Sequence, residues 1–256
     1  MTTTFSRFSL DGNRALVTGA SRGLGQAVAI AFAEAGADVG CVSSKKGGCA
    51  DTARAIRELG QEAWELTADL SDRSQVMALA GEADEVLGGP SILVNNAGTI
   101  RRQPAATYTA EDWDVVMNTN IDSMFFLCQS IGRTMLERKR GKIITVASLL
   151  SFSGGITVPA YAASKHAVAG LTKALANEWA GSGVNVNAVA PGYFATDNTE
   201  ALRGDVKRSS EILGRIPAGR WGQAEDITGA VVFLASPASD YVNGHVLVVD
   251  GGWMAR

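Results

Sequence analysis

Tyr161 and Lys165 are the residues of this sequence whose types and spacing most directly suggest chemistry. The phenol of a tyrosine has a pKa of about 10, which is too high for efficient proton exchange near neutral pH. Residues four apart in a helix share a face, so the Lys165 ammonium can lie beside the phenol oxygen and lower that pKa. The pair then suits general acid–base catalysis at moderate pH. Ser148, thirteen residues upstream at the end of the apolar run 141–147, could hydrogen-bond a substrate oxygen.

A glycine-rich segment near the N-terminus distinguishes this interpretation from an ordinary surface pair with the same spacing. It reads Thr18-Gly19-Ala-Ser-Arg-Gly23-Leu-Gly25, between a strand-like run and a helix-like run, which is the context that this motif requires. Glycines let the backbone turn sharply and approach a pyrophosphate. The phosphate then lies at a helix N-terminus, where N–H groups and the helix dipole favour an anion. Together, the two motifs predict binding of a nicotinamide dinucleotide and its use on a carbonyl or an alcohol.

Strand-like and helix-like segments alternate along the chain without a linker. Strands are predicted at 14–18, 38–42, 63–67, 91–95, 141–147, 184–189 and 245–249, and helices at 23–35, 50–59, 72–87, 111–139, 159–180 and 224–235. The alternation predicts an α/β fold in a single domain over residues 1–256: a Rossmann-type doubly wound sheet of about seven mostly parallel strands, with helices on both faces. Right-handed crossovers place the carboxyl ends of the strands at one edge, where ligands bind. Gly19, Asn96, Ser148 and Pro191 fall at such ends.

Composition excludes several classes of function. The 256 residues are 46% apolar and 19% charged, which is typical of a chain with a sizeable core and not of a disordered one. A net charge of −3 does not indicate a surface for nucleic acid or anionic membranes. Two histidines and three scattered cysteines do not suggest a structural metal site, and the odd cysteine count fits a reducing cytoplasm. The sequence has no signal-like N-terminal run and no run near the roughly 18 apolar residues that a membrane span requires.

Taken in order, the motifs resemble those of the short-chain dehydrogenase/reductase family over essentially the whole chain. Besides the two motifs above, the resemblance rests on Asp69 after the third strand, Asn95-Asn96-Ala97-Gly98 after the fourth, Asn120 in a long helix, Pro191-Gly192 after the sixth strand, and Asp250-Gly251-Gly252 near the end. The resemblance implies a homotetramer.

The resemblance also implies a role for each catalytic candidate. Tyr161 is expected to be the general acid/base, and Ser148 is expected to hold the substrate oxygen. Lys165 is expected to bind the nicotinamide ribose and to lower the Tyr161 pKa. Asn120 is expected to hold a water molecule in the proton relay. All four residues are present, so the sequence does not suggest an inactive member of the family.

The choice of dinucleotide depends on the end of the second strand. The sequence reads Val42-Ser43-Ser44-Lys45-Lys46 there, with no carboxylate to bind ribose hydroxyls and repel a 2′-phosphate. Lys45, Lys46 and Arg22 could pair with that phosphate, which favours NADP(H) slightly over NAD(H). Alternatively, the lysines form a solvated loop and Ser43 accepts an NAD ribose. The predicted cofactor contacts are Gly19, Ser21, Arg22, Gly23, Leu24, Gly25, Ser43, Ser44, Lys45, Asp69, Leu70, Asn96, Ala97, Gly98, Tyr161, Lys165, Pro191, Gly192 and Thr196.

The substrate class follows from a closer resemblance within the family. The stretches 95–102, 190–199 and 250–256 resemble the members that oxidise 2-deoxy-D-gluconate and 2-dehydro-3-deoxy-D-gluconate, which are sugar acids. Arg101 and Arg102 directly follow the Asn-Ala-Gly turn at the mouth of the expected site. A guanidinium can bind a carboxylate through two parallel hydrogen bonds, so at least one of the two is predicted to bind the substrate. The alternative is that both are solvated loop residues.

The polar, irregular segment 192–216 corresponds to the lid of the family, with Thr196 expected near the nicotinamide amide. Thr196 could also simply cap a helix. Two other functions stay open. One is reduction of 3-oxoacyl groups on acyl carrier protein, with the basic residues of 133–140 as the docking surface or as an ordinary helix C-terminus. The other is a dinucleotide-sensing protein without turnover, against which the complete catalytic set argues.

Overall fold

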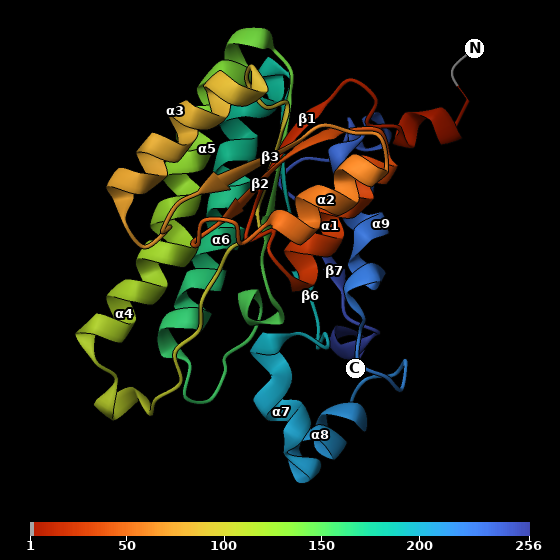
Figure 1. Cartoon of the computed structure of the whole chain (residues 1–256). Helices are drawn as coiled ribbons and strands as arrows, with labels where there is room; N and C mark the ends of the chain where they lie inside the picture. Colours follow the sequence, from red (N-terminus) through yellow and green to blue (C-terminus); the bar gives the residue numbers. More distant parts are fainter. Residues whose placement is uncertain (1–2) are drawn as a thin grey trace.

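The computed structural model describes residues 3–256, and a seven-stranded, entirely parallel sheet forms its centre (Figure 1). The strands are β1 (Arg14–Thr18), β2 (Asp38–Ser43), β3 (Ala63–Thr67), β4 (Ile92–Asn95), β5 (Gly141–Val146), β6 (Val184–Pro191) and β7 (Val246–Val249). Their order across the sheet is β3-β2-β1-β4-β5-β6-β7, so the chain winds outward from β1 and then from β4 in the other direction. The predicted α/β doubly wound sheet is confirmed, and it is parallel throughout instead of mostly parallel.

Helices cover both faces of the sheet, as apolar parallel strands require. Successive residues of β1 point to opposite faces: Val17 belongs to one apolar core and Leu16 to the other. The first core is closed by α1 (Gly23–Glu34), α2 (Ala50–Glu58) and α9 (Thr228–Ala235), and the second by α3 (Arg73–Leu87), α5 (Ser123–Arg138) and α6 (Pro159–Trp179). No helix within residues 3–256 combines the length and the apolar character needed to cross a membrane.

Local sequence signals fix where the helices after each strand begin. Asp72 caps α3 by accepting the Ser74 N–H at 2.8 Å. Thr109 caps α4 (Ala110–Met117) by accepting the Asp112 N–H at 3.1 Å. Pro159 opens α6, where its missing N–H costs no helical hydrogen bond. Since these helices follow β3, β4 and β5, they begin on the side of the sheet where the strands end, and they frame the predicted site.

Two predicted helices are interrupted. The helix predicted at 111–139 consists of α4, a π-helical turn over Asn118–Asp122, and α5. The helix predicted at 224–235 consists of a 3-10 turn over Ala224–Ile227 followed by α9. Apolar periodicity continues through such turns, so the sequence pattern indicated unbroken helices.

The lid contains two helices where the sequence predicted irregular structure. They are α7 (Glu200–Gly204) and α8 (Val206–Leu213), drawn in cyan at the lower edge of Figure 1. Asp205 caps α8 by accepting the Arg208 N–H at 3.0 Å. The prediction was wrong because both helices are short and largely exposed, with Ile212 as the buried residue of α8, so the apolar pattern is too sparse to recognise.

Candidate active site

The glycine-rich segment forms a tight turn from β1 into α1. Gly19 and Gly23 have φ angles of 65° and 57°, in the left-handed region that glycine adopts without strain. Among the described residues, the N-cap Arg22 makes no side-chain hydrogen bond to the first turn of α1, which leaves N–H groups for an external anion. A Cβ at Gly25 would collide with the Gly19 carbonyl oxygen and with Nδ2 of Asn96. The turn therefore fits the pyrophosphate of a dinucleotide.

Asn96 fastens the end of β4 to this turn. Its Nδ2 donates to the carbonyl oxygens of Thr18 at 2.8 Å and Gly19 at 3.2 Å. The Thr18 hydroxyl accepts the N–H groups of Asn96 and Ala97, each at 3.0 Å. The predicted contacts at Asn96, Ala97 and Gly98 therefore lie beside the glycine turn, at the point where the strand order reverses.

The predicted adenosine-binding residues lie at the ends of β2 and β3. Ser43 is buried, and its hydroxyl donates to the Lys45 carbonyl at 2.7 Å, which closes the loop after β2. Ser44, Lys45 and Lys46 are exposed on that loop. The other predicted contacts on this side are Ser21 in the glycine turn, Leu24 in the first turn of α1, and Asp69 and Leu70 after β3.

Tyr161 and Lys165 share one face of α6, and Ser148 follows β5 opposite them. Lys165 Nζ lies 5.5 Å from the centroid of the Tyr161 ring and donates to the Val146 carbonyl at 2.6 Å. Lys165 is 4% exposed, and this burial lowers its pKa to about 8. Burial raises the pKa of Tyr161, whereas the Ser148 hydroxyl and the Arg102 charge lower it. In the chain alone, burial outweighs them, so the Tyr161 pKa lies above its usual value and not below it as predicted.

Asn120 lies in the π-helical turn and is 3% exposed. Its Oδ1 accepts the Thr99 N–H at 2.8 Å, and its Nδ2 donates to the Thr99 carbonyl and the Ser164 hydroxyl, each at 3.0 Å. A π turn places an irregularity inside a helix and recurs at functional sites. The sequence interpretation did not single out Ser164, although its position three residues after Tyr161 places it near the catalytic face of α6.

The two adjacent arginines have different surroundings. Arg101 donates to the Thr99 hydroxyl at 2.9 Å, and its Nε lies 3.4 Å from the Asp112 carboxylate. Arg102 is exposed and, among the described residues, has no carboxylate partner within 4.0 Å, yet its charge acts on the Tyr161 phenol. Of the two arginines, Arg102 is therefore the one whose guanidinium is not engaged by a carboxylate among the described residues.

The start of the lid lies over the glycine turn. β6 ends at Pro191, and a Cβ at Gly192 would lie 2.6 Å from the Asp250 Cα. The Thr196 Cγ2 lies 3.8 Å from the position of a Cβ at Gly23. Nε of Arg22 pairs with Asp197 at 2.7 Å. Thr196 and Arg22 therefore lie close to the predicted path of the cofactor, although Arg22 faces the lid.

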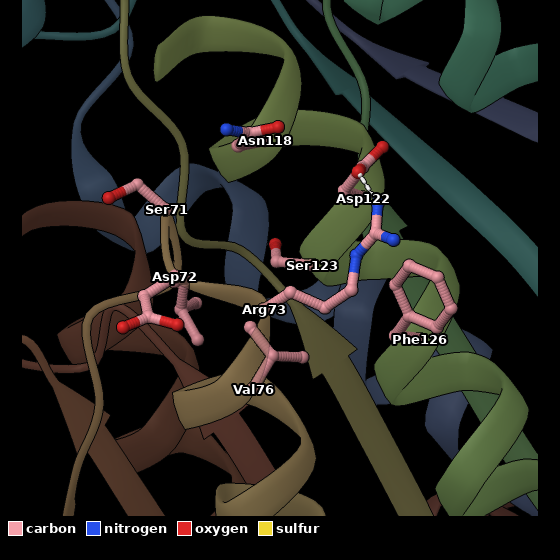
Figure 2. Close-up of a pocket in the computed structure, with 9 residues that line it drawn as sticks. Ser71, Asp72, Arg73, Val76, Asn118, Asp122, Ser123 and Phe126 are labelled. Carbon is pink, nitrogen blue, oxygen red and sulfur yellow. Dashed lines mark hydrogen bonds and ion pairs between the residues drawn. The ribbon is translucent and has the colours of Figure 1, made fainter. Parts of the chain in front are cut away.

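A cavity of about 430 Å³ lies between the start of α3 and the π turn (Figure 2). Of the predicted site residues, it contacts Leu70. Figure 2 shows Arg73 pointing to Asp122, with which it forms an ion pair, and its guanidinium carbon lies 4.5 Å from the centroid of Phe126. The positive charge of Arg73, which lines this cavity, is therefore already paired with a carboxylate of the same chain.

Two of the four basic residues before β5, Arg138 and Arg140, make internal contacts. Arg138 donates to the carbonyl oxygens of Gly89 at 2.8 Å and Gly88 at 3.0 Å. Arg140 donates to the Asn13 side chain at 3.0 Å. These contacts engage half of the basic cluster within the chain, which does not favour the predicted alternative of a carrier-protein docking surface.

Comparison with known proteins extends over nearly the whole chain. A family model described as Enoyl-(Acyl carrier protein) reductase matches residues 19–254. The 2-dehydro-3-deoxy-D-gluconate 5-dehydrogenase of Bacillus subtilis is 55% identical over 249 residues, which cover 97% of each chain. An Agrobacterium tumefaciens structure with bound NADP, provisionally named a 2-deoxy-D-gluconate 3-dehydrogenase, is 52% identical with a TM-score of 0.92 and covers 98% of this chain and 99% of that one.

A second solved structure carries an organic acid beside the cofactor. The gluconate 5-dehydrogenase of Burkholderia cenocepacia, in complex with NADP and tartrate, is 42% identical with a TM-score of 0.95. The match covers 99% of this chain and all of that one. With the predicted motifs, the observed fold and these similarities in agreement, the chain belongs to the short-chain dehydrogenase/reductase family.

Proposed function

We propose that this protein is an NADP(H)-dependent oxidoreductase of keto sugar acids of the 2-deoxygluconate or 3-deoxy-uronate type. The observation that carries the proposal is the arrangement of Ser148, Tyr161 and Lys165 at the carboxyl edge of the sheet, next to the loop after β4 on which Arg102 is exposed. That loop lies close to Lys165, because a Cβ at Gly98 would be 3.8 Å from Lys165 Nζ. An acid/base residue and an arginine are thereby brought to one place, as a substrate with both a carbonyl and a carboxylate requires. The names of the relatives support the same substrate class.

The chain's own residues would handle the proton and the substrate oxygen. Tyr161 gives its proton to the carbonyl oxygen in reduction and takes it back in oxidation. The Ser148 hydroxyl holds the same oxygen, and buried Lys165 lies beside the phenol and would bind the ribose of the cofactor. The nicotinamide, when bound, supplies or accepts the hydride. Asn120 keeps the π turn against α6 through its contact with Ser164.

Arg102 is the proposed partner of the substrate carboxylate. A guanidinium–carboxylate pair is among the stronger charge-assisted hydrogen bonds, and its fork fixes orientation as well. Arg101 already has Thr99 and Asp112 as partners, so it shapes the loop instead of binding substrate. The earlier hypothesis that at least one arginine binds the acid is thereby narrowed to Arg102.

NADP(H) is the proposed cofactor. Lys45 and Lys46 are exposed on the loop after β2, and no carboxylate stands in the segment 42–46 to repel a 2′-phosphate. NADP in two similar solved structures supports this choice. We also infer a cytoplasmic homotetramer. Its support is the partly exposed edge strand β7 and the three unpaired cysteines, which fit a reducing compartment. Light scattering in solution tests the tetramer.

The experiment is oxidation of NADH and of NADPH, in parallel, with 3- and 5-keto sugar acids and a short 3-oxoacyl thioester. Arg102→Ala should raise the KM for the acid about 10- to 100-fold, the usual range for a hydrogen bond to a charged group, with the KM for NADPH unchanged. Arg101→Ala is the matched control and should have the smaller effect. The KM for a neutral keto sugar should be unchanged in Arg102→Ala. Turnover on the thioester alone, or an unchanged KM in both variants, would contradict the proposal.

A further inference from the structure

Ser164 is a buried hydroxyl that joins the two catalytic elements. It is fully buried in α6, one position before Lys165 and three after Tyr161. Its Oγ donates to the Tyr161 carbonyl at 2.8 Å and accepts the Asn120 Nδ2–H at 3.0 Å. One hydroxyl therefore connects the backbone of the acid/base residue with the π turn.

The side chain of Asn120 has few alternatives to this contact. Two of its three hydrogen bonds, at 2.8 and 3.0 Å, are to the backbone of Thr99 and hold it to the loop after β4. An amide nitrogen has two hydrogens, and here one goes to Thr99 and the other to Ser164. Ser164 is thus the side-chain link between the Asn120 amide and α6 in residues 3–256.

The other hydrogen bond of Ser164 affects Tyr161 itself. A serine that donates to a carbonyl in the preceding turn competes with the helix's own hydrogen bond and bends the helix locally. Here the carbonyl belongs to the residue that carries the phenol. The carbonyl of Lys165 is held separately, by the Ser151 hydroxyl at 2.7 Å. A substitution of Ser164 should therefore displace the side chain of Tyr161 more than that of Lys165.

We propose that Ser164 is a positioning residue that sets the place of the Tyr161 phenol relative to Ser148 and the substrate oxygen. This inference rests on the proposed function, because it requires Tyr161 to be the acid/base. The groups that face the phenol are the Ser148 hydroxyl, the Lys165 ammonium and the Arg102 guanidinium. Displacement of the ring from Ser148 and Arg102 weakens the two influences that lower its pKa.

The test compares Ser164→Ala with a matched variant in the same helix. Thr172 is also fully buried in α6, and its hydroxyl donates to the Val168 carbonyl at 2.8 Å, but among the described residues it has no contact with Asn120. Thr172→Val thus removes an equivalent internal hydroxyl away from the site. Ser164→Ala should lower kcat about tenfold or more, as small misplacements of catalytic groups do. It should also raise the pKa of the tyrosine in the pH–rate profile.

Binding and rescue separate positioning from a merely structural role. NADPH affinity, measured by fluorescence titration, should change less than about twofold in Ser164→Ala, since Lys165 keeps its contacts. Ser164→Thr keeps the hydroxyl and should restore most of kcat. Thr172→Val should keep the kcat and pH profile of the natural chain, whatever its effect on melting temperature.

Two results would overturn the inference: an unchanged kcat and pH profile in Ser164→Ala, or the same losses in Thr172→Val. Tyr161→Phe, assayed alongside, separates this failure from failure of the proposed function. If Tyr161→Phe keeps its turnover, the proposed function is wrong. If Tyr161→Phe is inactive while Ser164→Ala is normal, only the role of Ser164 is wrong.

Discussion

The edge of the sheet and the lid hold their side chains in different ways. At the carboxyl edge of the sheet, Asn120 and Lys165 are 3% and 4% exposed. The amide of Asn120 is hydrogen-bonded to the backbone of Thr99, and the ammonium of Lys165 to the carbonyl of Val146. In the lid, α7 has no buried residue, and the ion pair to Arg22 joins side chains that are 77% and 65% exposed. Exposed ion pairs contribute little to stability, whereas a buried hydrogen-bonded group is costly to disturb.

The difference separates two tasks. The side chains proposed to meet the reacting atoms are held in place by strands and helices, which would reduce reorganisation during the reaction. The segment after Pro191 is anchored by the buried side chains of Phe194, Ile212 and Ile216, while its α7 helix is exposed, so it is held less extensively than the strand ends. Substitutions at the carboxyl edge of the sheet should therefore have large effects on turnover, cofactor binding or stability, and substitutions at exposed positions should have small ones.

The largest effect is expected from Tyr161→Phe. The change removes the proton donor but leaves the ring in place, so turnover should fall about 10²- to 10⁴-fold while NADPH still binds. Initial rates and fluorescence titration measure the two quantities. Tyr241, which is fully exposed, supplies the control, and Tyr241→Phe should leave both unchanged. A Tyr161→Phe variant that keeps turnover would remove the tyrosine from the reaction.

A smaller but still severe effect is expected from Gly25→Ala. The new methyl group would collide with the Gly19 carbonyl oxygen and the Asn96 amide, so the turn must shift. Overpacking of this kind costs about 1–3 kcal/mol, and NADPH affinity should fall about tenfold or more. Thermal melting and titration measure both.

Gly170→Ala is the matched control for this change. Gly170 lies on the exposed side of α6, with no atom within 4 Å of a new Cβ. Alanine is the better helix former, so this variant should gain up to about 1 kcal/mol. Equal behaviour of the two alanine variants would mean that the glycine turn tolerates a side chain.

The last expected effect, on stability and not on turnover or binding, is the pH dependence contributed by Lys165. Its pKa is lowered to about 8 in the folded chain from 10.5, so below pH 8 folding must bury a full ammonium charge. Between pH 8 and 10 the unfolded chain binds the extra proton, and the free energy of unfolding should rise with pH. Lys165→Met should therefore be more stable at pH 7, by up to roughly 3 kcal/mol, with an advantage that shrinks toward pH 10.

Urea unfolding at pH 7, 8, 9 and 10 measures this difference. The range stops at pH 10, where the phenol of Tyr161 is already about half ionised in the unfolded chain; both chains carry this tyrosine, so its titration contributes to both. Lys173→Met, on the exposed side of the same helix, is the control. A stability difference for Lys165→Met that stays constant over the whole range would show that burial does not alter the charge of Lys165.

The sequence predicted the fold, and most of the residues at the carboxyl edge of the sheet, because both depend on local sequence patterns. Apolar strands bounded by glycine, asparagine and proline locate the sheet, and parallel connection then brings their ends together without any knowledge of contacts. Asn96 and Ser148 were placed after a strand in this way, and the structure has them there. Tyr161 and Lys165 were placed on one helix by their spacing, and both lie in α6.

The remaining features depend on contacts between distant segments. Arg101 and Arg102 are the same residue type in adjacent positions, and only the partner at Asp112 distinguishes them. The π turn at Asn120 leaves no trace in the apolar pattern, because it is held by the backbone of Thr99. Lys165 was predicted to lower the Tyr161 pKa, but burial, which depends on how distant segments pack around the phenol, raises it.

The strand order has a consequence for how specificity can change over evolution. β1 to β3 come from residues 14–67, and β4 to β7 come from residues 92–249, with α3 as the connection between the halves. The proposed phosphate-reading lysines lie in the first half, and Arg102 lies in the second. Under these proposed roles, the residues that select the cofactor and the residue that binds the substrate lie in separate stretches of the gene, so mutation can change either preference without altering the other stretch.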